Sequence, residues 1–284
     1  MGSFDQTKAY APQEDVFFDD GREIELLHFV YSHPKIDKIR GSPKDVLAAI
    51  DEFGRTKKYL MNVGEDKGRI VCDLIADVKP KTMVELGGYV GYSCILYADA
   101  VRKAGGKQYF SFERNPEFAA VISSLVDLAG LDDIVKVVVG SSDESLARLY
   151  ESGALKHIDL MFLDHYKPAY TTDLKLCEEL GLITPGSVLA ADNVIKPGNP
   201  PYLEYVRSSV VDKKKNYGGE GNGNSTQGIA EKTVKQYANR YASEKFSKSP
   251  GNPNLVYESK IVNSYEPTGV PDGVEITRCV GEEK

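Results

Sequence analysis

TMVELGGYVGYSCILYADAVRKA, residues 82–104, decides the fold of this chain. Its first five residues, 82–86, form an apolar run of strand length, and a glycine-rich loop follows at once. Residues 92–104 then have the length and apolar spacing of a helix. A strand that passes through glycines into a helix begins a βαβ unit, so this stretch predicts an α/β domain with a parallel sheet.

The same alternation of strands and helices continues outward from this stretch. Three helices are expected before it, at 22–32, from Ser42 to 53 and at 65–78. Further strands are expected at 108–113, 135–140, 158–164 and 187–193, with helices at 116–130, 143–153 and 171–183 between them. The runs LVYESKIVN (255–263) and GVEITRCV (273–280) predict an antiparallel pair that closes the sheet edge. The pattern therefore predicts one mostly parallel, doubly wound sheet with an antiparallel C-terminal edge and extra N-terminal helices.

Two segments fall outside this alternation. Residues 1–19 are polar and lack apolar periodicity, so we expect a flexible N-terminal tail before a single domain that spans 20–284. Residues 211–254 are rich in Gly, Asn and Lys and are expected to form a surface insertion, with one short charged helix at 230–246.

The composition excludes several classes of protein. The formal net charge of -7 and the single basic run at 213–215 argue against a nucleic-acid partner. We find no run of about 18 apolar residues and no signal peptide, so no membrane span is expected. The four cysteines show no paired spacing, which favours the reducing cytoplasm. Zinc is not expected, because only four histidines are present and none pairs with a cysteine at ligand spacing.

Oxygen-bearing side chains follow two of the predicted strands, LMFLDHYK (160–167) and VLAADN (188–193). Asp164 ends the first strand, and Asp192 and Asn193 end the second. The carboxyl ends of neighbouring parallel strands face one crevice, so these side chains are expected to meet there. Two carboxylates and an amide suit Mg²⁺. The alternative is that Asp192 caps a helix and that Asp164 forms an ordinary ion pair with Lys167.

Lys167 stands three residues beyond Asp164. A partly desolvated lysine beside a divalent cation loses its proton more readily than one in water. Lys167 is therefore a candidate general base for a hydroxyl whose acidity the metal raises. The alternative is a solvated surface lysine.

The loop E-L-G-G-Y-V-G (85–91) lacks the GxGxxG spacing of dinucleotide-binding proteins. Its acidic first residue and the four-residue separation of Gly87 and Gly91 are closer to the S-adenosylmethionine loop of methyltransferases. Glu113 ends the next predicted strand, where a carboxylate can accept hydrogen bonds from both ribose hydroxyls. The alternative is that these glycines only permit a tight turn.

With these motifs, the chain resembles the catechol O-methyltransferase family. The resemblance covers roughly residues 20–210 and resumes at 264–276, and DHxK together with ADNVxxPG is specific to this family. It implies a Rossmann-like methyltransferase domain that uses S-adenosyl-L-methionine and Mg²⁺ and methylates a small catechol. On the acceptor side, the resemblance implies that Asp164, Asp192 and Asn193 hold Mg²⁺, that Lys167 is the base and that Glu266 binds the second catechol hydroxyl. For the cofactor, it implies that Glu113 binds the ribose and that the aminoacyl end lies beside Met61, Val63, Glu85, Gly87, Tyr89 and Ser93. The residues that it implies around the cofactor and its adenine are Ser142, Asp143, Asp164 and His165.

Some positions depart from the family pattern. Tyr59 and Tyr166 stand where the mammalian enzymes have tryptophans, and this chain has no Trp. Lys196 replaces an apolar residue beside the catechol, Arg114 replaces an apolar neighbour of the adenine, and the insertion has no counterpart in the short animal enzymes. These changes leave open a related cation-dependent enzyme that acts on larger phenylpropanoid or flavonoid catechols.

The resemblance also implies a monomer, since the soluble members of the family usually act alone. We expect the enzyme to hold both reactants in one orientation, which replaces a costly bimolecular encounter. A non-catalytic binding module with this fold would have lost the metal or lysine positions, and the chain retains them. A nicotinamide oxidoreductase is disfavoured because the GxGxxG motif is absent.

Overall fold

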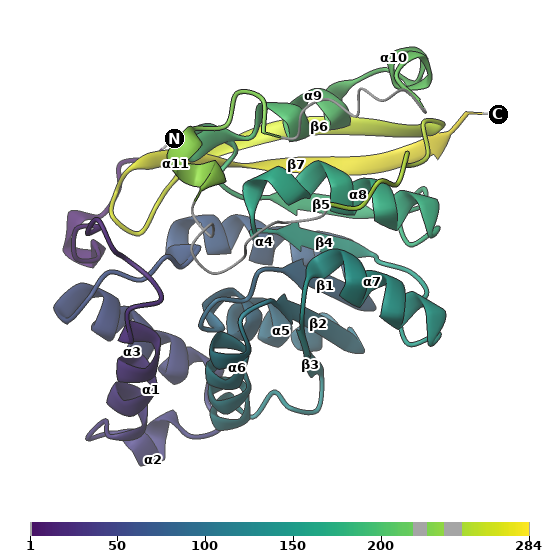
Figure 1. Ribbon diagram of the computed structural model, residues 1–284. Helices are drawn as coiled ribbons and strands as arrows, with labels where there is room; N and C mark the ends of the chain where they lie inside the picture. The colour runs from purple at the N-terminus through teal and green to yellow at the C-terminus, as the bar shows by residue number, and fades with distance from the viewer. Residues whose placement is uncertain (1, 218–225, 236–245, 284) are drawn as a thin grey trace.

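In the part of the chain that the structure describes, seven strands form one sheet in the order β3-β2-β1-β4-β5-β7-β6 (Figure 1). We describe a computed structural model over residues 2–217, 226–235 and 246–283. Neighbouring strands from β3 to β5 pair in parallel, whereas β7 pairs antiparallel with both β5 and β6. The strands are β1 (Thr82–Leu86), β2 (Gln108–Glu113), β3 (Val135–Val139), β4 (Leu160–Leu163), β5 (Val188–Ala191), β6 (Leu255–Tyr265) and β7 (Pro271–Glu282).

Helices cover both faces of this sheet. One apolar core joins the first six helices to one face, and a second core joins three later helices to the other. The first layer contains α1 (Arg22–Tyr31), α2 (Ile36–Ile39), α3 (Pro43–Thr56), α4 (Gly64–Val78), α5 (Tyr92–Lys103) and α6 (Pro116–Ala129). The second contains α7 (Ser142–Glu151), α8 (Tyr170–Glu179) and α9 (Pro200–Arg207), with the short α10 (Val210–Lys215) following α9.

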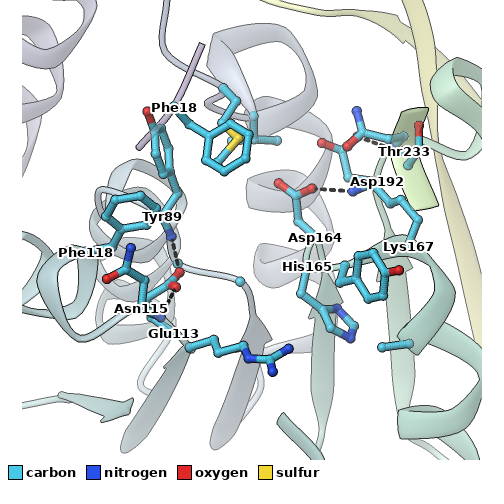
Figure 2. A pocket seen from close by; sticks show the side chains of 18 of the residues that line it. Phe18, Tyr89, Glu113, Asn115, Phe118, Asp164, His165, Lys167, Asp192 and Thr233 are labelled. Carbon is cyan, nitrogen blue, oxygen red and sulfur yellow. Dashed lines mark hydrogen bonds and ion pairs between the residues drawn. The ribbon is translucent and has the colours of Figure 1, made fainter. Parts of the chain in front are cut away.

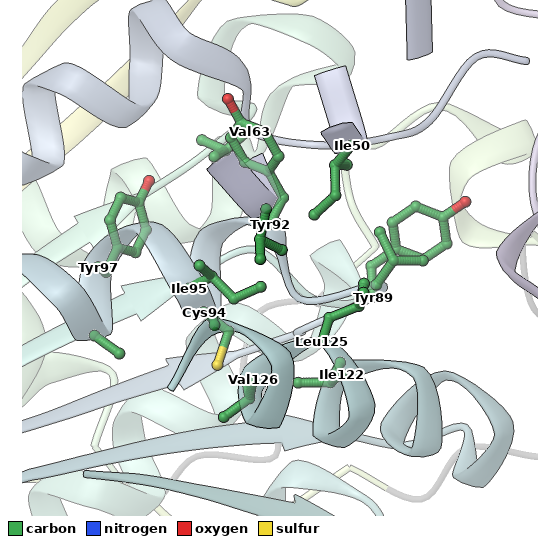
Figure 3. Close-up of a cluster of buried hydrophobic side chains, with 14 of the residues drawn as sticks. Ile50, Val63, Tyr89, Tyr92, Cys94, Ile95, Tyr97, Ile122, Leu125 and Val126 are labelled. Atoms are coloured by element: carbon green, nitrogen blue, oxygen red, sulfur yellow. The ribbon is translucent and has the colours of Figure 1, made fainter. Parts of the chain in front are cut away.

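Buried aliphatic side chains hold the first layer to the sheet. Figure 3 shows Ile95 of α5 beside Ile122 and Leu125 of α6, and none of these three side chains is exposed. Each such side chain stabilises the fold by roughly 1.5–3 kcal/mol when it leaves water. The glycine loop between β1 and α5 is therefore anchored on both sides by well-packed elements.

The predicted doubly wound sheet with an antiparallel C-terminal edge is confirmed. β1 and β2 have the predicted bounds, and the three N-terminal helices lie where they were expected. The structure adds α2, α9 and α10, which the apolar pattern did not indicate. Of the helix predicted at 230–246, only α11 (Glu231–Val234) is observed, and 236–245 lie outside the described residues.

Residues before α1 contact the rest of the domain. The Tyr10 side chain is buried, and its hydroxyl donates a 2.6 Å hydrogen bond to Asp51 of α3. Its backbone N–H donates to the carbonyl of Pro267 in the β6–β7 turn. The domain boundary at residue 19 remains a prediction.

Across the described part of the chain, no helix is both long and apolar enough to span a bilayer.

Candidate active site

The strand order reverses direction between β1 and β4, and a cavity of about 1300 Å³ opens at the carboxyl ends of the parallel strands. Ligands of open α/β sheets bind at this position. Figure 2 shows two groups of side chains across the cavity, with Tyr89 and Glu113 on one side and Asp164, Lys167 and Asp192 on the other. The following predicted site residues line it: Met61, Val63, Gly87, Tyr89, Ser93, Glu113, Ser142, Asp143, Asp164, His165, Lys167, Asp192, Asn193 and Glu266.

Glu85 is the predicted site residue that the structure does not place in the cavity wall. Its side chain is fully buried and accepts hydrogen bonds from Ser111 Oγ at 2.6 Å and Tyr109 Oη at 2.9 Å. Strand side chains alternate between the two faces of a sheet, and Glu85 shares the face of Met83, toward the first helix layer. Burial raises the pKa of Glu85 to about 7. Glu85 therefore supports the glycine loop from behind.

The glycine loop lies against the segment that follows β4. A Cβ atom at Gly87 would stand 2.6 Å from the carbonyl oxygen of Asp164, which is closer than such atoms approach. The backbone of Gly87 also has a φ of 93°, a left-handed value that favours glycine. Gly87 thus permits the two halves of the cavity to meet at backbone contact distance.

Glu113 ends β2 beneath this loop. Its carboxylate accepts hydrogen bonds from the backbone N–H groups of Tyr89 at 2.9 Å and Asn115 at 2.8 Å. Burial raises the pKa of Glu113 to about 7, against the opposing effect of these N–H donors. The backbone N–H groups of Gly88 and Arg114 also lower this pKa, so Glu113 is an acceptor surrounded by donors in the cavity wall.

On the other side of the cavity, Lys167 lies in a one-turn 3-10 helix that follows β4. Its Nζ atom is 3.0 Å from Oδ1 of Asp164 and 2.8 Å from the Tyr170 hydroxyl. About a tenth of the Lys167 side chain is exposed. The amine is therefore held inside the cavity by short polar contacts.

Lys67, in the first turns of α4, is a site residue that the sequence motifs did not reveal. Its side chain has no exposed surface, and Nζ lies 2.8 Å from Asp192, 2.7 Å from Glu266 and 3.1 Å from Asp272. Burial acts to lower the pKa of Lys67, but the three carboxylates raise it well above its usual range. Lys67 is thus a buried ammonium among three acids.

Asp272 is the second residue that the motifs missed. Its carboxylate accepts hydrogen bonds from the Asn193 amide at 3.0 Å and from the backbone N–H of Lys196 at 2.9 Å. Asn193 Nδ2 also donates to Glu266 at 2.7 Å. Both amide protons of Asn193 are therefore used, and its Oδ1 atom is the one left for a further partner.

The donor set of Asp164, Asp192 and Asn193 fits a hard cation. All three line the same cavity. Burial raises the pKa of Asp192, and the negative charge of Asp164 raises it further. Two neighbouring carboxylates and an amide oxygen are ligands that Mg²⁺ accepts. Within the described ranges, no group of three His, Cys, Asp or Glu side chains could hold a metal ion, and the candidate set combines two carboxylates with the Asn193 amide.

His165 and Ser142, both in the cavity wall, share Asp173 as a hydrogen-bond partner. His165 Nε2 lies 2.9 Å from Oδ2 of Asp173, and the Ser142 hydroxyl also donates to Asp173. The imidazole is stacked on the Tyr170 ring with centroids 4.9 Å apart. These contacts fix a flat polar wall where the resemblance predicts the adenine.

Described residues of the insertion form part of the cavity wall. The Tyr166 hydroxyl donates a 2.6 Å hydrogen bond to the carbonyl of Val234 in α11, and the Tyr166 and Phe246 rings are stacked. Phe246 and Lys232 line the cavity, and α11 packs against the turn that carries Lys167. Figure 2 places Thr233 on the Lys167 side of the cavity.

Comparison with known proteins places this chain among methyltransferases. The sequence model described as O-methyltransferase matches residues 42–207. A catechol O-methyltransferase of Bos taurus is 38% identical over 198 residues, which are 70% of this chain and 71% of that protein. Catechol O-methyltransferase B of Danio rerio is 42% identical over 170 residues, 60% of this chain and 64% of that protein. The fold matches that of an O-methyltransferase from Bacillus cereus solved in complex with SAH, with a TM-score of 0.54, 19% identity and coverage of 90% and 97% of the two chains.

Proposed function

Because this chain belongs to the O-methyltransferase family, we propose that it transfers the methyl group of S-adenosyl-L-methionine to one hydroxyl of a catechol. The observation that carries this proposal is the shared cavity. The glycine loop and Glu113 line one side, while Lys167, the oxygen-ligand set and Glu266 line the other. A methyl donor and a dihydroxylated ring would thus bind next to each other.

On the donor side, Glu113 would accept hydrogen bonds from the ribose hydroxyls. Its carboxylate is fixed by two backbone N–H groups, so a ligand meets a preformed acceptor. Met61, Val63, Tyr89 and Ser93 would surround the aminoacyl end, and His165 would lie along the adenine.

On the acceptor side, Asp164, Asp192 and Asn193 would hold Mg²⁺, which when bound would increase the acidity of a chelated hydroxyl. Glu266 would accept a hydrogen bond from the second hydroxyl and so favour two adjacent hydroxyls over one. Asp164 lies next to Lys167 and would keep the amine beside the reacting oxygen.

Lys167 would take the proton of the reacting hydroxyl onto Nζ. The phenolic oxygen would then attack the sulfonium methyl in line, so that an O–CH₃ bond forms as the S–CH₃ bond breaks. The bonding electron pair stays on sulfur, which becomes neutral. Holding the two reactants in this orientation removes much of the entropic barrier to their encounter.

The alternative acceptor is a larger phenylpropanoid or flavonoid catechol. Described residues of the insertion support this alternative, because Lys232 and Phe246 extend the cavity wall beyond the strand ends. A monomer in the cytoplasm remains our expectation, in keeping with four cysteines that are all free.

The metal assignment is tested by titration of the apoprotein with Mn²⁺, followed by electron paramagnetic resonance. We expect one tight Mn²⁺ site in the wild type and at least tenfold weaker binding in Asp164→Asn. Treatment with EDTA is expected to stop methylation, and added Mg²⁺ to restore it. Activity that persists in EDTA would exclude the metal from the proposed function.

A further inference from the structure

Lys67 connects three parts of the chain that are far apart in sequence. Helix α4 supplies the ammonium, the end of β5 supplies Asp192, and the β6–β7 hairpin supplies Glu266 from its turn and Asp272 from the start of β7. Each carboxylate lies within 3.1 Å of Nζ. One fully buried cation therefore determines the relative positions of acids that adjoin the acceptor side of the cavity.

The contacts of Asp272 extend this network to the cavity wall. Asp272 is fully buried and accepts hydrogen bonds from the backbone N–H groups of Ile195 and Lys196. It also accepts one from Asn193, whose amide bonds Glu266 as well. Displacement of Asp272 would therefore move the turn at 194–198 and Asn193 together.

A buried ion network is weak evidence for a role in stability, because hydrophobic residues of similar volume often stabilise a fold as well or better. The partners of Lys67 are the two acids that the proposed function assigns to the metal and the acceptor, together with their common neighbour. The Lys67 ammonium therefore contacts the acids whose separation would determine how the metal and the acceptor bind.

We propose that Lys67 is a positioning residue that fixes the separation between Asp192 and Glu266, and so sets the orientation in which the acceptor binds. This inference rests on the proposed function. The ammonium neutralises acids that would otherwise repel one another. Without it, Glu266 and Asp192 would move apart, and the two hydroxyls of one ring would no longer fit both.

The glycine loop and Glu113, on the donor side, belong to other elements than those that carry this network. The glycine loop and Glu113 lie at the ends of β1 and β2, and Glu113 is fixed by backbone N–H groups rather than by Lys67. Loss of the Lys67 charge is therefore expected to affect the acceptor and leave the methyl donor bound. This separation distinguishes a positioning role from general destabilisation.

The test compares Lys67→Met and Lys67→Arg with the wild type. For Lys67→Met we expect at least a tenfold increase in acceptor KM, at least fivefold weaker Mn²⁺ binding, and a shift in the ratio of the two monomethylated isomers of a 4-substituted catechol. The Kd for S-adenosylhomocysteine, measured by calorimetry, should change less than twofold. Lys67→Arg keeps the charge and should restore part of the isomer ratio.

Lys103→Met is the matched control, because Lys103 pairs with Asp99 at an exposed site away from the cavity. If Lys67→Met does not fold, Asp272→Asn keeps the shape of the network with one charge less, and it should shift the isomer ratio and acceptor KM in the same direction. A folded Lys67→Met, or failing that Asp272→Asn, with unchanged isomer ratio, acceptor KM and Mn²⁺ affinity would overturn the inference. A wild type that methylates no catechol would instead refute the proposed function, and the Mn²⁺ measurement would still report on Lys67.

Discussion

The Nζ atom of Lys167 lies 3.0 Å from Oδ1 of Asp164, and both side chains face the same cavity (Figure 2). The two residues are three positions apart, one at the end of β4 and the other in the turn that follows. The predicted base and a predicted metal ligand therefore share one short segment. The amine of Lys167 would thus be held at a fixed distance from the metal that makes the reacting hydroxyl more acidic.

Replacement of Lys167 by methionine removes the proton acceptor and keeps most of the side-chain volume. We expect kcat to fall by roughly 10²- to 10⁴-fold, the usual contribution of a general base. The Kd for S-adenosylhomocysteine should change less than twofold, since the glycine loop and Glu113 belong to other elements. Turnover within threefold of the wild type, measured beside Lys103→Met, would show that Lys167 is not the base.

Binding of the cofactor product should depend on pH through Glu113. Burial raises the pKa of this carboxyl to about 7, and only the ionised form is purely an acceptor for ribose hydroxyls. The affinity for S-adenosylhomocysteine should therefore rise several-fold between pH 6 and pH 8. Glu113→Gln should bind roughly 10- to 100-fold more weakly, as expected for loss of hydrogen bonds to a charged group, and without this pH dependence. Calorimetry that gave equal pH slopes for both proteins would contradict the ribose assignment.

Glu85 should make the fold less stable as the pH rises. Its pKa is raised from 4.5 to about 7, so the folded state binds a proton that the unfolded state has already lost between these values. The free energy of unfolding should fall by roughly 3 kcal/mol across that window. Glu85→Gln cannot ionise and should lose this component of the pH dependence.

Urea unfolding at pH 5 and pH 8 measures the effect. The stability of Glu85→Gln relative to the wild type should increase from the lower to the higher pH. Glu117→Gln, at an exposed position in the first turn of α6, should show no such change. Parallel pH profiles for Glu85→Gln and the wild type would mean that Glu85 is ionised throughout.

Acceptors with a negative side chain should be preferred over those with a positive one. Lys196, Lys232 and Lys235 line the cavity and are exposed, with Lys235 paired to Glu231, while Lys167 is already bonded to an acid. At low salt we expect kcat/KM for a catechol carboxylate to exceed that for a catechol amine of equal chain length by about tenfold, because clustered charge raises local substrate concentration. Lys196→Met should reduce this ratio, as should added salt. A preference for the amine would contradict the prediction.

The strand ends were predictable because the apolar runs before them are unambiguous. β1 and β2 have the expected bounds, and Asp164 and Asp192 directly follow β4 and β5. Parallel pairing of β4 with β5 then brings both acids to one edge of the sheet. These contacts depend on local patterns and on one general rule of sheet architecture.

Lys67 and Glu85 show what local patterns could not provide. Lys67 meets Asp192 and Asp272 across 125 and 205 residues, a juxtaposition that only the complete fold creates. A signal was present, because Lys67 lies on the same face of α4 as the buried Val71 and Leu74. A lysine on the apolar face of a helix predicts a buried partner. Glu85 was expected beside the cofactor, but strand alternation turns its side chain toward the helices.

The most direct test of the proposed function compares two ring isomers under identical conditions. Transfer of a radiolabelled methyl group from S-adenosyl-L-methionine is measured with 1,2-dihydroxybenzene and with 1,3-dihydroxybenzene, each with Mg²⁺ and with EDTA. The proposed function predicts labelled product from the 1,2-isomer with Mg²⁺ and little or none in the other three reactions, because only adjacent hydroxyls would reach both the metal and Glu266. Equal labelling of the two isomers, or labelling of the 1,2-isomer in EDTA, would contradict it.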